Sequence, residues 1–211
     1  MNKVEKIFLI ISTIAFVICV IFILFIDVSN NIEGIENYNK EYFIEKYHGD
    51  LDSNLSIFPD DKSILKNAEF SSSFNDGLFD GDGYIILSAK YNENEYNREI
   101  DRLNKISVDI SNCNKEFFTN NIKYDEISYN YPAYISIDGF SCTYEYALLD
   151  KDNLQIIYIY LSYPSINNKK YNKYLKKDKS VYFWLSTWDL YSMYNHSFDN
   201  GKSYVEFDDC K

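Results

Sequence analysis

The longest uninterrupted run of apolar residues lies near the amino end of the chain, from Ile7 to Ile26. Sixteen of its twenty positions are Ile, Leu, Phe or Val, and none is charged. A helix of this length covers about 30 Å, the hydrocarbon thickness of an ordinary bilayer. A core helix of a soluble domain would normally show a polar face or end sooner. The pattern therefore predicts a transmembrane helix over residues 7–26, embedded in the lipid bilayer.

The charges on either side of this run predict its orientation. Lys3 and Lys6 precede the run, whereas Asp27 and Glu33 follow it before the next basic residue. Positive flanking charge stays on the cytoplasmic side of a membrane. We therefore expect a single-pass protein of the cell membrane, with residues 1–6 cytoplasmic and the C-terminal domain outside.

The same segment matches a cleaved or lipid-modified leader poorly. Ile18 stands where a lipobox needs a small residue, and the apolar run continues beyond Cys19. No A-x-A pattern of small residues follows the run, which also exceeds the usual h-region of about 7 to 15 residues. We expect a retained anchor, with release by cleavage near Ser29 as the alternative.

Residues 27–60 are predicted to form a juxtamembrane helix and loop. Aromatic and aliphatic residues recur near helical spacing from 36 to 47, which predicts a short helix there. Pro59 keeps the residue before it out of helical geometry. Residues 50–61 are therefore expected to be a loop with a brief extended piece at residues 57–58.

Alternation with a period of two predicts a β-hairpin next, with one strand at residues 68–74 and the other at 85–91. The Gly- and Asp-rich connection at residues 76–83 resembles half of a calcium loop through Asp80 and Asp82. An EF-hand register would, however, put leucine and alanine at two ligand positions. A turn closing the hairpin is the favoured interpretation, and a weak cation site at Asp80 and Asp82 is the alternative.

The clearest helical pattern outside the apolar run extends from Asn92 to Ile106. Asn92 is a favourable N-cap, and Glu95 three residues later completes a capping box. Apolar residues form one stripe at helical spacing, and pairs of opposite charge such as Glu99 with Arg102 are expected on the exposed side. We predict a helix lying across a sheet, with solvated charges rather than a catalytic acid.

A second β-hairpin is predicted between residues 133 and 148. Apolar residues alternate on both sides of Asp138-Gly139, a dipeptide typical of a two-residue turn. Further on, residues 154–163 are apolar on both faces, which is typical of a strand covered on both sides. We therefore expect an antiparallel sheet with this strand near its middle, the predicted helix on one face and another segment on the other.

Two stretches carry weaker patterns. Residues 107–131 are predicted to be a loop with a short strand near Ile127. Residues 181–194 include Trp184 and Trp188 at mixed spacing, which leaves open one helix or a strand followed by a helix. Core packing is the commoner use of such rings, and stacking on sugars is the alternative.

The sharpest contrast in charge lies at residues 169–179, where six lysines accompany a single aspartate. A binding role would set these lysines against an anionic envelope component, such as a wall polymer or lipid headgroups, or against an acidic protein partner. The commoner meaning of such a run is a solvated connection. The candidate partner-binding residues are Lys169, Lys170, Lys173, Lys176 and Lys177.

Composition narrows the classes of function. The 211 residues carry a formal net charge of −11, which argues against a nucleic-acid partner because phosphate binding needs a dominant basic surface. Only 7 Gly and 3 Pro occur, and no linker composition separates two outer domains. Cys113, Cys142 and Cys210 follow the apolar run, an odd number that implies no disulfide framework.

Familiar catalytic and cofactor motifs are absent from the sequence. His48 and His196 are the two histidines, and neither stands in a zinc-binding pattern. The signatures of serine hydrolases, P-loop proteins and dinucleotide enzymes do not occur. We therefore expect no cofactor and no metal beyond the weak cation candidate already named.

Together these patterns predict an α+β protein: an N-terminal single transmembrane helix followed by one antiparallel-sheet domain with a helix packed on the sheet, the outer domain covering residues 61–211. The expected function is a binding or interaction module at a bacterial cell envelope. The alternative is an envelope hydrolase that uses carboxylates as acid and base. A deep cleft with two facing carboxylates of raised pKa would favour the hydrolase, and a flat lysine-edged surface would favour binding.

Overall fold

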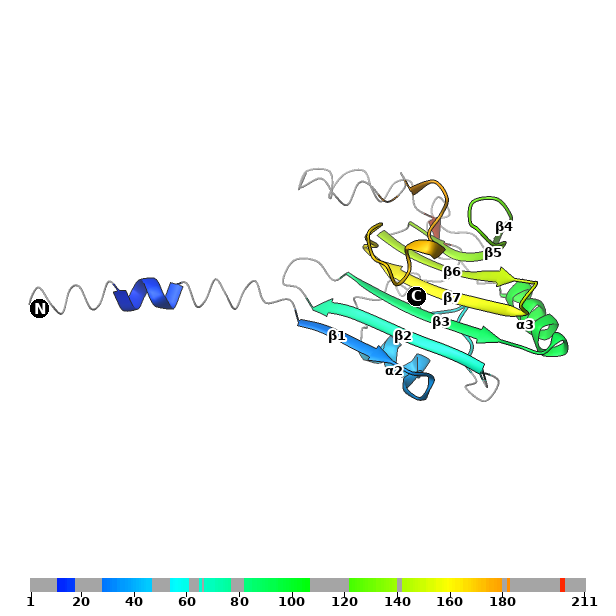
Figure 1. Ribbon diagram of the computed structural model, residues 1–211, viewed down its shortest axis with the longest axis horizontal. Coiled ribbons are helices and arrows are strands. Elements are labelled where there is room, and N and C mark those ends of the chain that lie inside the picture. Colours follow the sequence, from blue (N-terminus) through cyan, green and yellow to red (C-terminus); the bar gives the residue numbers. More distant parts are fainter. Residues whose placement is uncertain are drawn as a thin grey trace, which may run out of the picture.

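One antiparallel sheet organises the protein (Figure 1). The computed structural model describes residues 11–17, 28–46, 54–60, 65, 67–76, 82–106, 122–139, 142–179, 182 and 202–203. Within this part of the chain, eight strands form the sheet in the order β1-β2-β3-β7-β6-β5-β4, and β8 pairs with β5 beside β4. The strands are β1 (Val28–Glu33), β2 (Asn67–Asp76), β3 (Gly83–Lys90), β4 (Lys123–Asp125), β5 (Ala133–Asp138), β6 (Thr143–Asp150), β7 (Gln155–Ser162) and β8 (Lys202–Ser203).

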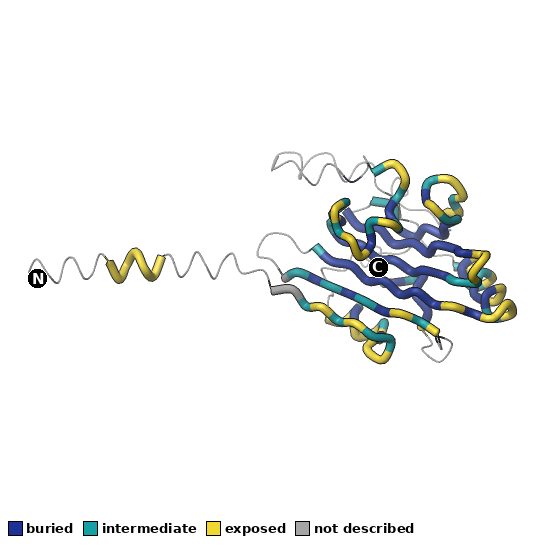
Figure 2. The backbone as a smooth tube through the Cα atoms, viewed as in Figure 1, coloured by how far each residue is buried: buried dark blue, intermediate teal, exposed yellow. Residues whose placement is uncertain are grey.

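Strand β7 lies in the middle of the sheet, as predicted. It pairs with β3 on one side and with β6 on the other. Tyr158 and Tyr160 contribute to the core on one face, and Ile157 and Ile159 to a separate core on the other face. Figure 2 shows the resulting pattern, with buried residues along β3, β7 and β6 and exposed ones along β1. A strand that is apolar on both faces requires cover on both.

Helix α3 (Glu93–Lys105) packs on the first face, and its predicted start is confirmed. The Asn92 side chain accepts the Glu95 backbone N–H at 2.9 Å, while the Glu95 carboxylate accepts the backbone N–H of Asn92 at 3.4 Å. Tyr96 and Leu103 are buried and belong to the core of this face. The α+β class with a helix on an antiparallel sheet is therefore what the structure shows.

The segment that follows the apolar run also belongs to this core. Strand β1 pairs with β2, and the predicted short helix is present as a 3-10 turn, η1 (Ile35–Asn37), followed by α2 (Lys40–Lys46). Phe43 of α2 is fully buried, with its ring centroid 5.4 Å from that of Phe70 in β2. Residues 28–46 are thus part of the sheet domain rather than a separate piece beside the membrane.

The loop at residues 54–60 covers the same face. Leu55, Ile57 and Phe58 are fully buried. The extended piece predicted at residues 57–58 is wrong, because the backbone N–H of Phe58 donates to the Leu55 carbonyl at 3.0 Å and closes a turn. The sequence pattern marked a loop here, but it did not show that three of its side chains fill the core.

Residues 163–179 and Tyr182 cover part of the second face of the sheet. This segment contains a short 3-10 helix, η4 (Asn172–Tyr174), and crosses in front of the sheet in Figure 1. Tyr171, Leu175 and Tyr182 pack on apolar residues of β5, β6 and β7. The lysine-rich stretch therefore contributes Tyr171 and Leu175 to the second core, while most of its lysines are exposed.

Both predicted hairpins are present, but the β5–β6 connection differs in detail. Gly139, with φ of 85°, donates its backbone N–H to the Thr143 carbonyl at 2.9 Å, so the connection is longer than two residues. A shift of register between Ile135 and Ile137 puts Ile137 opposite Glu145. One extra residue in a strand reverses the faces of those beyond it. The predicted two-residue turn and the unbroken alternation through Ile137 are both wrong.

The short strand predicted near Ile127 lies slightly earlier in the chain, at β4. Ile127 itself is 80 % exposed in the bend that follows. The Trp-containing stretch, from 183 to 194, lies outside the described residues.

Of the predicted membrane segment, the structure describes residues 11–17, which are helical. Ile11, Ile14, Phe16 and Val17 are between 48 % and 69 % exposed. No helix in the described part of the chain is both long enough and apolar enough to cross a membrane.

Candidate functional site

The five candidate lysines do not form one patch, because they point to different parts of the fold. Lys176 pairs with Asp138 of β5, and both side chains are only 15 % exposed. The Lys177 ammonium donates a hydrogen bond to the Ile127 carbonyl at 2.9 Å. These two lysines fasten the segment to the β4–β5 end of the sheet. They hold the fold together and are poorly placed to receive a partner.

Lys170 makes a contact with the opposite edge of the sheet. Its ammonium lies 2.8 Å from a carboxylate oxygen of Glu33 at the end of β1. The hydrogen bond and the charge of Lys170 lower the pKa of Glu33, and the same pair raises the pKa of Lys170. Both groups are exposed, so the pair is worth little in stability. Its effect is to place the 169–174 segment above β1 and β2.

A groove lies where this segment approaches the sheet. It has a volume of about 430 Å³, within the range of small-ligand sites. Its floor is formed by β2 and β3, and its walls by the end of β1 and by η4. It is lined by Glu33, Gly34, Ile35, Ala68, Glu69, Phe70, Ser71, Ile86, Ser88, Lys170, Lys173 and Tyr174. Of the five candidate lysines, Lys170 and Lys173 line the groove.

The groove is mixed in charge rather than basic. Glu33 and Glu69 line it together with Lys170 and Lys173. The Lys173 ammonium lies 4.6 Å from the centroid of the Tyr174 ring, a geometry that favours a cation over an aromatic face. The lysine run in the sequence signalled a basic surface, whereas the opposing carboxylates come from strands over 100 positions earlier in the chain.

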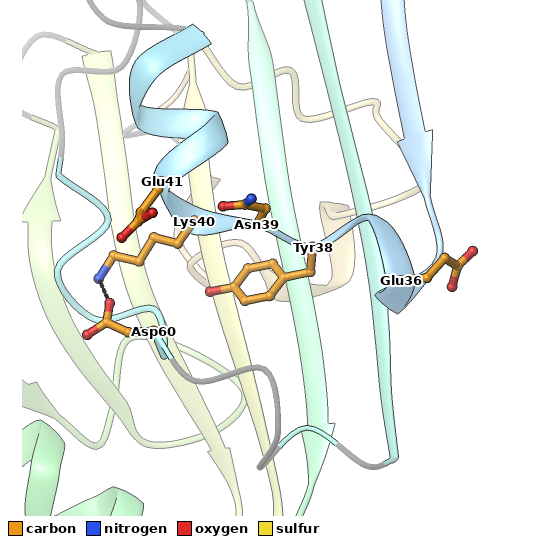
Figure 3. Close-up of a pocket in the computed structure, with 6 residues that line it drawn as sticks. All are labelled: Glu36, Tyr38, Asn39, Lys40, Glu41 and Asp60. Atoms are coloured by element: carbon orange, nitrogen blue, oxygen red, sulfur yellow. Dashed lines mark hydrogen bonds and ion pairs between the residues drawn. The ribbon is translucent and has the colours of Figure 1, made fainter.

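A second hollow, of about 380 Å³, lies at the start of α2 (Figure 3). Lys40 reaches across it to Asp60, with 2.6 Å between the ammonium and a carboxylate oxygen. The Tyr38 hydroxyl donates to the Pro59 carbonyl at 2.6 Å. Glu36 points away from this pair in Figure 3. Lys40 and Tyr38 are thus engaged in holding residues 58–60, which makes this hollow a structural junction.

The weak cation candidate is only partly described. Asp82 accepts a hydrogen bond from the Asn75 side-chain amide at 2.6 Å, and Asp80 lies outside the described residues. Within the described part of the chain, no three His, Cys, Asp or Glu side chains gather as a metal site would require. Cys142 is buried, whereas Cys113, Cys210 and both histidines lie outside the described residues.

A buried network between α3, β7 and loop 54–60 was missed by the sequence analysis. Glu99 was expected on the exposed side of its helix, but it is buried. Arg102 lies against both of its oxygens, at 2.7 to 3.0 Å. The Tyr158 hydroxyl donates to Glu99 at 2.6 Å and lies 2.9 Å from the Tyr91 hydroxyl. Burial raises the pKa of Tyr158 and of Tyr91, so both remain protonated donors.

The same network reaches loop 54–60. Arg102 donates to the Ile57 carbonyl, while the Ile57 backbone N–H donates to the fully buried carboxylate of Glu145 at 3.0 Å. The side chains of Arg102 and Glu145 therefore hold the backbone carbonyl and the backbone N–H of Ile57. A signal was present in the sequence: Glu99 and Leu103 are four positions apart, and residues at that spacing share a helical face.

Polar groups converge at the groove and at the buried network, among other places in the described part of the chain. The network is largely buried and its polar groups are hydrogen-bonded to one another, which is typical of a structural role. The groove is open to solvent and holds charges from three separate elements, which makes it the candidate functional site. Comparison of the chain with protein family models, with curated proteins and with solved structures gave no match.

Proposed function

We propose that the chain is a single-pass membrane protein, with its amino end inside the cell, whose α+β domain binds a ligand at the outer face of a bacterial envelope. Two observations support the anchor: the charge-free run at residues 7–26 and the exposure of Ile11, Ile14, Phe16 and Val17. Four large apolar side chains exposed on one helical segment need cover, and a bilayer would supply it.

The groove supports the proposed role in ligand binding. It is open, it is lined by side chains of both charges, and its carboxylates and hydroxyls come from strands of the sheet. Sites on rigid elements hold polar groups in defined positions. The lysine-rich segment contributes one wall of this site, which refines the expected role of Lys170 and Lys173. Lys169 remains a proposed contact beside the groove.

The hydrolase alternative is less well supported. A general acid needs a carboxyl of raised pKa. The pKa values of two described carboxyls, Glu33 and Asp125, are shifted, and both are shifted downwards. Burial would raise the pKa of Asp125, but hydrogen bonds from the Ser128 and Ile127 backbone and from the Ser128 hydroxyl lower it further than burial raises it. These shifts favour the charged form, which suits binding better than acid catalysis.

Filling the groove should abolish retention on envelope material. Ser71→Tyr puts a ring into the groove from β2, and tyrosine is well tolerated in strands. We expect the full chain in mild detergent to lose about tenfold or more in retention on isolated envelopes, which corresponds to about 1.4 kcal/mol. Ser73→Tyr is the matched control, because it adds the same ring two residues along the same face, outside the groove. Equal retention of both variants would refute the role of the groove.

Protease accessibility in intact cells tests the proposed membrane topology. Trypsin added to intact cells should cleave at the exposed lysines Lys169, Lys173 and Lys177, because they are expected outside. Mass spectrometry of the released peptides would identify the cuts. Cleavage only after the cells are opened would show that the domain is inside and would overturn the proposed location.

A further inference from the structure

Two charged side chains of the groove, one on its floor and one on a wall, are candidates for contacts with a ligand. Glu33 and Lys170 neutralise each other at 2.8 Å. Glu69 of β2 and Lys173 of η4 also line the groove and are exposed. Within the described part of the chain, neither Glu69 nor Lys173 forms an ion pair. The site therefore offers one carboxylate and one ammonium that are available to a ligand.

The remaining lining is suited to a ligand that is polar along its length and apolar to one side. Ser71 and Ser88 present hydroxyls on the floor, and the Ser88 oxygen already accepts the Gln155 side-chain amide. Ile86 and Tyr174 add apolar surface beside them. Hydroxyls can donate to and accept from a peptide backbone, and aliphatic and aromatic surface takes up an apolar side chain.

We propose that the groove binds a short peptide with free ends, its ammonium at Glu69 and its carboxylate at Lys173. This assignment rests on the proposed function and names the ligand class of the same groove. Because Glu33 and Lys170 neutralise each other, a polyanion would meet one ammonium, that of Lys173, and one repelling carboxylate, that of Glu69. A neutral glycan would cover Glu69 and Lys173 without compensating either charge, which costs free energy. A dipolar ligand satisfies both.

The test uses trialanine as the probe, with its N-acetylated and C-amidated forms, and isothermal titration calorimetry of the full chain in mild detergent. We expect saturable binding of trialanine with Kd below about 1 mM, and a loss of about tenfold or more on capping either end. Glu69→Gln should abolish the preference for a free amino end and leave the preference for a free carboxylate. Lys173→Gln should do the reverse. Lys151→Gln, at an exposed lysine in the turn between β6 and β7 and outside the groove, should bind as the original chain does.

This crossed pattern separates a ligand contact from a loss of folding, because a misfolded variant would lose both preferences together. Urea unfolding of each variant provides the second check. Three results would overturn the proposal: no saturable binding of trialanine, equal binding of capped and free peptides, or preferential binding of chitotetraose or of polyphosphate. If Ser71→Tyr abolishes envelope retention while trialanine does not bind, the proposed function stands and the peptide assignment falls.

Discussion

Phe43→Ala is expected to lower the free energy of unfolding by about 3–5 kcal/mol, the usual cost of truncating a buried phenylalanine to alanine. Phe43 is fully buried and packs on Phe70, so its removal leaves a cavity between α2 and the sheet. A domain is typically stable by about 5–15 kcal/mol, which makes this a large fraction of the total. Urea unfolding of the full chain in mild detergent, followed by circular dichroism, would measure the change.

Tyr42→Ala is the matched control for this variant. It removes a ring of similar size from the neighbouring position, but Tyr42 is 42 % exposed and makes an edge contact with Phe43. We expect a loss of about 1 kcal/mol or less. Equal effects of the two substitutions would contradict the docking of α2 on the sheet. Residues 36–47 would then be better described as a separate helix beside the membrane.

Arg102→Ala is expected to be the second most destabilising change, with a loss of about 2–4 kcal/mol. Removal of one partner from a buried ion pair typically costs about 3–5 kcal/mol, because the other charge remains buried without compensation. The Glu99 side chain is 5 % exposed, whereas that of Arg102 is 34 % exposed, so solvent around the arginine reduces the expected cost. The substitution also removes the donor to the Ile57 carbonyl. Urea unfolding at neutral pH would measure it.

A second substitution, at Glu99, identifies the cause. Without Arg102, the buried Glu99 carboxylate loses its compensating partner. Glu99→Gln removes that charge, so adding it to Arg102→Ala should recover part of the lost stability. Arg98→Ala, on the exposed side of the same helix, is the control and should be nearly neutral. A loss in Arg102→Ala that Glu99→Gln does not reduce would argue against an uncompensated Glu99.

Local patterns predicted the elements whose cause is local. The capping box at Asn92 depends on residues three positions apart. The apolar composition of residues 154–163 predicted a central strand because any strand buried on both faces needs it. Strand β1 was missed, since Ser29, Asn30 and Asn31 have low β-propensity. Its backbone pairs with β2 at the edge of the sheet, where few side chains need to be apolar.

The site shows the same division between short-range and long-range causes. The sequence marked Lys170 and Lys173 as unusual, because a local run of lysines stands out in an acidic chain. It did not indicate the carboxylates opposite them, since Glu33 and Lys170 are 137 positions apart. It also did not indicate that Lys176 is used to bind Asp138.

Composition and periodicity are sufficient for the α+β class, the hairpins, the start of α3 and the apolar run at the amino end, because each depends on hydrogen bonds or burial within about twenty residues. The mixed charge of the groove, the burial of Glu99 and the bulge before Ile137 depend on which strands become neighbours. That choice is made when the whole chain packs, since an ion pair or a buried carboxylate is stabilised only by partners that folding brings from distant positions.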